Sequence, residues 1–405
     1  DIFGSRGLGD VYKRQIAHPA ALDGILYFTA NDGTHGEREL FKYDPGTGIA
    51  SLLADINGTP DPSYVAQLTP FNGKLYFSAS TAALGAELWV YDPVADTTHN
   101  VMDIIPGAGS SSPGALTVIE DKLYFSASNQ PINRELWSYD GDTAVQEAEL
   151  NPGGDGFMGG FNPQMAWYDG KIFFRGNNGT SGNELASFDP ATGQTVIETE
   201  IRSGSEGGDP EGFIVYDGKL IFAADDDIYG EEIWSYDGTT VTRITDLDTG
   251  STDSDPKYPY VWEDALYFSA RGQFDGADVG EEIWKYDGEN VQLVKDLKPG
   301  HEGGIPRYFT PFQDKLYFQG QIRNVVGREL FYMQQGAGVC CATATAACND
   351  TTIQLDATGN GSITTSSINN TEALECDFTQ TGASLSQAAF TLSLIHISEP
   401  TRPED

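Results

Sequence analysis

Positive charge is scarce in this 405-residue sequence, which carries 23 Lys and Arg residues against 60 Asp and Glu residues, a net charge of -37. Such a chain repels the phosphates of nucleic acids and the surfaces of anionic membranes. Nucleic-acid binding is therefore a poor hypothesis. The imbalance is greatest at residues 206–296, with 23 acidic and 6 basic residues. That sector is where a cation or a basic partner is expected.

Long apolar runs are missing too. No stretch of about 18 apolar residues occurs, so the sequence predicts no membrane-spanning helix. The opening DIFGSRGLGDVYKRQ lacks the basic, apolar and small-residue pattern of a signal peptide. Residues 1–15 and 393–405 resemble translated sequencing-adapter sequence, and we leave both segments out of the fold prediction as non-native.

The common catalytic motifs are absent. The sequence holds no HExxH, GxSxG or P-loop motif, and its His residues are scattered at positions 18, 35, 99, 301 and 396. No cysteine precedes residue 340. The usual zinc and nucleophile arrangements find no support, and we assign no catalytic residue and no cofactor-binding residue.

What the sequence has instead is a repeat. The segment RELWSYDG at 134–141 has six relatives, each an acid followed by apolar and aromatic residues, at intervals of 47 to 50 residues. The recurring positions are Glu39, Glu87, Glu135, Glu184, Glu232, Glu282 and Glu329, with Trp89, Trp137, Trp234 and Trp284 two residues later in four copies. A feature repeated sevenfold is usually architectural.

Each unit contains four short apolar segments separated by turn residues. In residues 112–150 these segments are ALTVI, KLYFSA, ELWSYD and AVQEAEL. Asn-Gly and Asp-Gly pairs between the first two segments predict tight hairpins. Alternation places Leu and Phe of LYF on one face and Tyr on the other, so both faces of the sheet carry bulk. Each unit is expected to be a four-stranded antiparallel meander.

Units of about 50 residues without helical periodicity predict an all-β fold, a seven-bladed β-propeller of four-stranded blades over residues 16–335. The seventh unit shows no evident fourth strand. An incomplete, larger ring is the competing count.

The units resemble the ELW repeat of secreted bacterial propellers. The match rests on Glu87 to Trp89 with Asp92, and on the later segment VMDIIPGAGSSSP at 101–113. VKDLKPGHEGGIP at 294–306 is a second copy. The resemblance implies an extracellular or cell-surface location and no single activity.

The recurring glutamates share a face with the Trp residues, so their carboxylates need buried partners. Few cations are near, and main-chain amides of the preceding glycine-containing loop or of the adjacent blade are the expected donors. A ring of these glutamates around the central channel would instead make a cation site.

The acidic loops have two interpretations. Short loops rich in Asp and Gly suit Ca²⁺, which prefers hard oxygen ligands. Such loops also form as solvated turns without metal. The candidate ligands are Asp225, Asp226, Asp227, Glu231, Asp246, Asp248, Asp253 and Asp255.

Three further features stand apart from the repeat. Trp167 and Trp262 lie outside the ELW position and either pack within blades or stack on sugars. The insertion RGQFDGADVG at 271–280 breaks the regular loop length, and functional loops tend to deviate in this way.

Residues 336–392 differ in composition, being small and Thr-rich, and resemble the opening of an Ig-like module of Bacteroidetes surface proteins. A small, partial β-sandwich-like segment is expected there. It contains the four cysteines, Cys340, Cys341, Cys348 and Cys376. Their clustering suggests disulfides in an oxidising compartment, with three pairings open.

Together these features predict a monomeric propeller within a larger exported chain, acting as a non-enzymatic adhesion scaffold for a glycan or protein. The alternative is a carbohydrate-active enzyme with a carboxylate pair on the loops. Unlike polar residues at one channel mouth would favour an enzyme, and equivalent residues would favour a scaffold.

Overall fold

The computed structural model describes residues 17–31, 35, 38–58, 61–159, 163–312, 314–321, 329–334 and 338–341. Every regular element in these residues is a β-strand, which confirms the all-β prediction. Within the same residues, no helix is present that could cross a membrane. The segments 1–15 and 393–405 and most of the expected Ig-like module lie outside the described residues.

Seven four-stranded sheets follow one another along the chain. Blade one contains β1 (Ala17–Leu22), β2 (Ile25–Ala30), β3 (Glu39–Asp44) and β4 (Ile49–Ala54). Blade two contains β5 (Ala66–Phe71), β6 (Lys74–Thr81), β7 (Gly85–Asp92) and β8 (Thr97–Met102). Blade three contains β9 (Gly114–Ile119), β10 (Lys122–Ser128), β11 (Arg134–Tyr139) and β12 (Ala144–Gln146). Blade four contains β13 (Met165–Tyr168), β14 (Lys171–Asn177), β15 (Asn183–Asp189) and β16 (Gln194–Thr199).

The second half repeats the pattern. Blade five contains β17 (Glu211–Tyr216), β18 (Lys219–Asp225), β19 (Glu231–Tyr236) and β20 (Val241–Arg243). Blade six contains β21 (Lys257–Trp262), β22 (Ala265–Phe274), β23 (Ala277–Tyr286) and β24 (Val291–Lys295). Blade seven contains β25 (Arg307–Phe312), β26 (Lys315–Gly320), β27 (Glu329–Gln334) and β28 (Gly338–Cys341). In every blade the strands pair antiparallel in chain order, so the structure confirms the seven-bladed β-propeller.

Blade seven differs from the sequence-based expectation. Its fourth strand, β28, pairs with β27 through contacts such as Phe331 with Cys341 and Tyr332 with Cys340. The segment GVCC carries no repeat signal, and only its pairing with β27 shows that it is a blade strand. Of the disulfide candidates, Cys340 and Cys341 lie in β28, while Cys348 and Cys376 lie outside the described residues.

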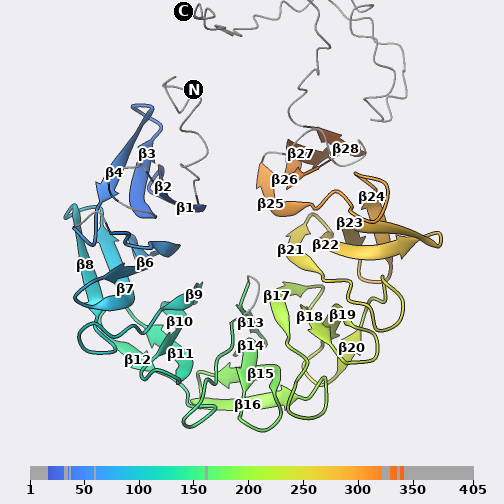
Figure 1. The fold of residues 1–405 in the computed structure, drawn as a ribbon, viewed down its shortest axis with the longest axis horizontal. Coiled ribbons are helices and arrows are strands. Elements are labelled where there is room, and N and C mark those ends of the chain that lie inside the picture. Colours follow the sequence, from blue (N-terminus) through green and yellow to red (C-terminus); the bar gives the residue numbers. More distant parts are fainter. Residues whose placement is uncertain are drawn as a thin grey trace, which may run out of the picture.

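The first strand of each blade lies innermost and the fourth outermost (Figure 1). Blades one and seven stand at the two ends of the ring, and each is built from four consecutive strands. Among the strands that the structure describes, none is exchanged between the chain ends to close the ring. We call the space between these two blades the seam.

The tight turns between first and second strands have the predicted chemistry. Asn72 and Gly73 both have positive φ, 48° and 73°, between β5 and β6, and Asp217 and Gly218 repeat this at 49° and 69°. Left-handed backbone at two successive residues favours Asn or Asp followed by Gly. The hairpin prediction is confirmed at these positions.

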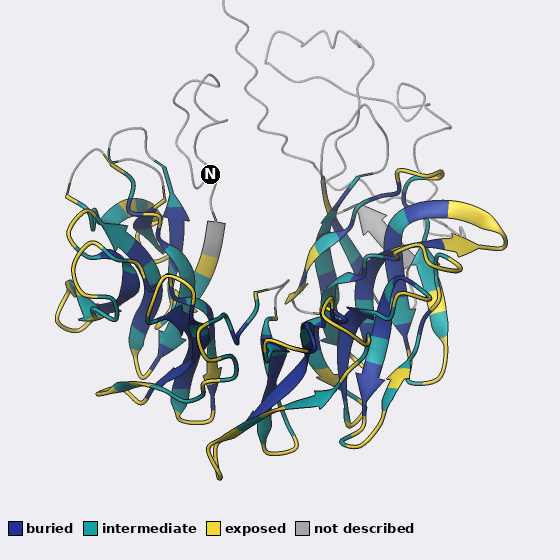
Figure 2. Cartoon of the chain, turned by 60° about the horizontal axis from the view of Figure 1, so that its bottom comes forward, coloured by how far each residue is buried: buried dark blue, intermediate teal, exposed yellow. Residues whose placement is uncertain are grey.

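Packing between blades supplies the core. Leu123, Phe125 and Trp137 of blade three pack towards blade two, whereas Tyr124 and Leu136 pack towards blade four. This division confirms that both faces of each strand are apolar. Figure 2 shows buried residues along the strands and exposed residues at the loops. Six such clusters each join two consecutive blades, and none of the six joins blade seven to blade one.

The seam leaves one repeat position exposed. Leu330 of β27 is 47% exposed. Its counterparts in the other blades are at most 3% exposed: Leu40, Leu88, Leu136, Leu185, Ile233 and Ile283. The same side chain therefore packs against the next blade six times and faces the seam once.

The insertion at 271–280 is an extension of two strands rather than an irregular loop. Residues of β22 and β23 stay paired from Leu266 with Tyr286 to Phe274 with Ala277, with one register shift near Gly272. The hairpin projects from blade six, and its tip is exposed (Figures 1 and 2). The expected functional loop is thus a β-hairpin.

Candidate functional site

The recurring glutamates are buried within the blades. Glu87, Glu184, Glu232 and Glu282 are fully buried, and Glu39 and Glu135 are nearly so. The side chain of Glu329 lies outside the described residues. In blade six, the Glu282 carboxylate accepts hydrogen bonds from the main-chain nitrogens of Leu297 (3.0 Å), Lys298 (3.0 Å) and Gly304 (2.7 Å).

Main-chain donors were expected, but their position differs from the loop before each glutamate. They belong to the segment that crosses to the next blade. Glu184 accepts bonds from Ile201 and Gly208, and Glu87 from Ile104 and Ser111. This segment is the PG-rich part of the repeat, which wraps around the carboxylate. A side chain at Gly156 would collide with the Glu135 carboxylate, its Cβ lying 2.3 Å from Oε2.

The tryptophans of the repeat are structural as well. The indole nitrogens of Trp137 and Trp284 donate to the carbonyls of Ala127 (3.1 Å) and Ala270 (3.0 Å) on the neighbouring strand. Trp234 makes the same bond to Ala224 (2.9 Å). Trp89 is also buried. These bonds hold the second and third strands of a blade together at the glutamate end.

Burial raises the pKa of these carboxyls despite the main-chain donors. It raises the pKa of Glu135 and Glu184 to about 7 and that of Glu282 to about 8. An acidic neighbour adds to the shift in pKa in each case: Glu149, Glu200 and Asp296, respectively. The folded state therefore binds protons that the unfolded chain releases near pH 4.5.

We expect the free energy of unfolding to fall as pH rises from about 5 to about 8. A carboxyl whose folded pKa is raised stabilises the fold below its unfolded pKa and loses that contribution as pH passes the folded value. Thermal unfolding between pH 5 and pH 8 measures this slope. The pKa values of Glu198 and Asp278 are lowered in the fold, so their contribution to stability is complete throughout this window and is lost only in more acidic solution.

Replacing Glu282 with glutamine should flatten the pH dependence, because one of the raised groups is lost. The matched control is Glu289→Gln, which removes the same charge from an exposed turn. A slope that is unchanged in Glu282→Gln, or equally changed in both variants, would contradict the assignment.

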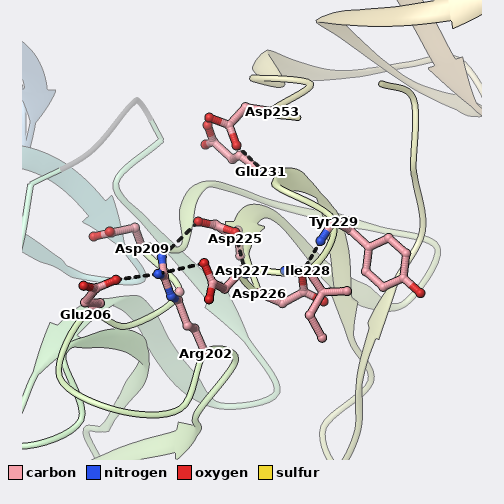
Figure 3. A network of polar contacts seen from close by, with 12 residues as sticks. Arg202, Glu206, Asp209, Asp225, Asp226, Asp227, Ile228, Tyr229, Glu231 and Asp253 are labelled. Carbon is pink, nitrogen blue, oxygen red and sulfur yellow. Dashed lines mark hydrogen bonds and ion pairs between the residues drawn. The ribbon is translucent and has the colours of Figure 1, made fainter. Parts of the chain in front are cut away.

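The candidate calcium ligands have protein partners. Arg202 binds Asp225 (3.2 Å), Asp227 (2.9 Å) and Glu206 (Figure 3). Asp226 accepts bonds from the main-chain nitrogens of Ile228 and Tyr229. These residues cap their own loop and tie it to the crossover before blade five.

The remaining candidates are dispersed. Asp246 contacts Arg243 (3.5 Å), Asp248 accepts from Gln273 (3.1 Å), and Asp253 accepts from the main-chain nitrogen of Glu231 (2.9 Å). In the part of the chain that the structure describes, no group of three or more His, Cys, Asp and Glu side chains could hold a metal ion. The geometry adds no support to calcium binding, which stays a sequence-based prediction.

A cluster of unlike charges lies where the inner strands of blades five to seven begin. Glu211, Lys257 and Arg307 are the first residues of β17, β21 and β25. Arg175 of β14 contacts Asp209 (3.3 Å) and Glu211 (3.7 Å). We call this cluster the inner rim: Arg175, Asp209, Glu211, Glu231, Asp255, Lys257, Tyr258, Arg307 and Tyr308.

The inner rim combines charge with aromatic surface. Lys257 pairs with Asp255. Burial, together with the charges of Glu211 and Asp255, raises the pKa of Glu231 to about 8. The rings of Tyr258 and Tyr308 meet edge-on at 5.2 Å, and Tyr308 is 63% exposed. Equivalent positions of different blades carry different side chains here, which the repeat architecture does not require.

Two of the histidines that the structure describes, His99 and His301, are exposed. His301 bonds Asp278 (2.7 Å), and His99 lies exposed on the outer strand β8.

Comparison with known proteins identifies the fold but no family. No family model matches the sequence, and no curated protein matches it. The resemblances to ELW repeats and to an Ig-like module stay predictions.

Solved structures do match. A prolyl endopeptidase structure superposes with a TM-score of 0.53 at 15% identity, over 82% of this chain and 51% of that one. A puromycin-hydrolysing peptidase from Mycobacterium tuberculosis gives 0.52 at 10% identity, over 82% and 53%. Prolyl oligopeptidase B from Galerina marginata, bound to a 35mer substrate, gives 0.50 at 10% identity, over 80% and 48%. The chain spans about half the length of these proteins.

These matches correct the functional hypothesis. At such low identity they show the fold alone, yet the three matched proteins named above are peptidases. They contradict the hypothesis of an adhesion scaffold and its carbohydrate-active alternative. The repeat that suggested a scaffold reflects how neighbouring blades pack. Proteins of different function can share such packing.

Proposed function

We propose that this propeller is a non-catalytic, peptide-binding domain that works with a peptidase domain. The similar structures are peptidases, and this chain corresponds to about half of each.

The observation that carries the proposal is the inner rim. It brings an exposed tyrosine together with partly buried arginines and several carboxyl groups from four neighbouring blades, close to where the innermost strands of blades five to seven begin. Tyr and Arg are enriched where proteins bind peptides and other proteins. The chain as a whole carries a net charge of -37, so it favours peptides with Lys or Arg.

The test is fluorescence anisotropy with labelled, unstructured peptides of basic, neutral and acidic composition, combined with a hydrolysis assay of the same peptides. We expect the basic peptide to bind best, with an affinity that falls as salt rises. The chain itself should cleave none of them.

Two variants locate the binding surface. Glu211→Gln with Asp255→Asn should weaken the basic peptide about tenfold, because each exposed ion pair contributes up to about 1 kcal/mol. Asparagine suits position 255, where φ is 49°. Glu289→Gln, on an exposed turn of blade six, is the control. Equal binding by all variants, or cleavage by the chain, would refute the proposal.

A further inference from the structure

At one position of the repeat, the usual aromatic residue is replaced in blade seven. In blades two to six, an aromatic ring near the end of the third strand packs into the preceding blade. These rings are Tyr91, Tyr139, Phe188, Tyr236 and Tyr286. In four interfaces the ring meets an aromatic ring of the preceding blade at 5.5 to 5.9 Å. Blade seven has Met333 at this position.

A cavity of about 500 Å³ lies beside Met333, the buried residue that stands in place of the aromatic ring. It is lined by Trp262, Tyr267 and Leu293 of blade six and by Met333 and Gln334 of blade seven. Its volume falls within the range of about 300 to 1,000 Å³ that is typical of small-molecule sites. We call it the blade-six hollow. Its lining residues belong to β21 to β24 and β27, strands that Figure 1 labels, and to the turns next to them.

The exposure of Tyr267 agrees with the replacement of the aromatic residue by Met333. Tyr267 is partly exposed, whereas its counterparts Tyr27, Tyr76, Tyr124 and Phe173 are at most 4% exposed. In those blades the next blade covers the ring. Trp262 contacts Tyr267 at 5.7 Å, so two aromatic faces line the hollow.

The charged residues that line the hollow are mostly acidic. Glu263, Asp264 and Asp287 border the hollow, against one ammonium, Lys285. Carboxylates next to aromatic faces suit a ligand with a ring and a positive charge. Gln292 offers an amide that can bond a hydroxyl, whereas the amide nitrogen of Gln334 already donates to the Asp314 carboxylate.

We infer that the blade-six hollow binds the phenol ring of a tyrosine-like amine. The ring occupies the space that tyrosine fills in four other interfaces, and the amine faces the carboxylates. The hollow lies at the end of β21 opposite to Lys257 of the inner rim, and the inference does not depend on the function proposed above.

The experiment is saturation-transfer NMR on the full chain with tyramine, p-cresol and phenethylamine. We expect tyramine to bind best, with a dissociation constant of about 1 mM, as suits a ligand of this size. The other two probes lack the amine or the hydroxyl and should bind about tenfold more weakly.

Variants of one residue separate the outcomes. Met333→Tyr should abolish tyramine binding, since its ring fills the hollow, and Met333→Leu should leave binding intact because the space stays open. If Met333→Tyr does not fold, Glu263→Gln provides the test, with tyramine weakened and p-cresol unaffected. No tyramine signal with the unaltered chain, or full binding by Met333→Tyr, would overturn the inference.

Discussion

Replacing Glu282 with alanine is expected to lower the free energy of unfolding by about 3 to 5 kcal/mol, because three main-chain donors lose their common acceptor. The substitution leaves the amides of Leu297, Lys298 and Gly304 buried without their acceptor. Each unsatisfied buried donor costs about 1 to 3 kcal/mol. Urea unfolding followed by tryptophan fluorescence measures the loss.

Two other variants serve as references for the expected loss in the free energy of unfolding. Glu282→Gln keeps an acceptor oxygen in place and should cost less than alanine. Glu289→Ala removes an exposed carboxylate of the same blade and should change the free energy of unfolding by about 0.5 kcal/mol or less. If Glu282→Ala were as mild as Glu289→Ala, the carboxylate would not hold the crossover segment.

Replacing leucine with alanine at the same repeat position in two blades should distinguish a packed interface between blades from the exposed seam. Leu88→Ala is expected to cost about 2 to 5 kcal/mol, because its side chain is fully buried between blades two and three. Leu330→Ala should cost about 1 kcal/mol or less, since nearly half of that side chain is exposed. The same urea titration gives both values.

This comparison also tests whether the ring is open in solution. Both residues follow the recurring glutamate directly, so local strand propensity is the same and only the neighbouring blade differs. Equal costs for the two substitutions would mean that blade one covers Leu330 in solution. A small cost at Leu330 with a large one at Leu88 is the result that the open seam predicts.

The hydrogen-bond donors to the recurring glutamates could be predicted only in part from the sequence. A carboxylate beside Trp in an apolar strand had to be satisfied by buried donors, and main-chain amides were the only plentiful choice. Which amides they are depends on how the crossover segment folds back by 15 to 24 residues, as from Glu282 to Leu297 and from Glu87 to Ser111. Local sequence carries no signal for that path.

The acidic loops and the inner rim show the same limit. Asp225 and Asp227 read as calcium ligands because their spacing is short, but Arg202 from another loop binds both. The rim joins residues such as Arg175 and Glu211 from different blades. The hollow did have a sequence signal, since ELFYMQQ lacks the Tyr-Asp pair of its relatives, but its meaning required the neighbouring blade.

The period, the strand order within each blade, the hairpin turns and the alternation of side chains between faces were determined by the sequence alone. All four depend on residues close together in the chain. Only the tertiary structure decided the fourth strand of blade seven, the partners of the buried carboxylates, the exposed seam and the composition of the inner rim. Each of these arises where separate blades or distant segments meet, and no local pattern encodes such a contact.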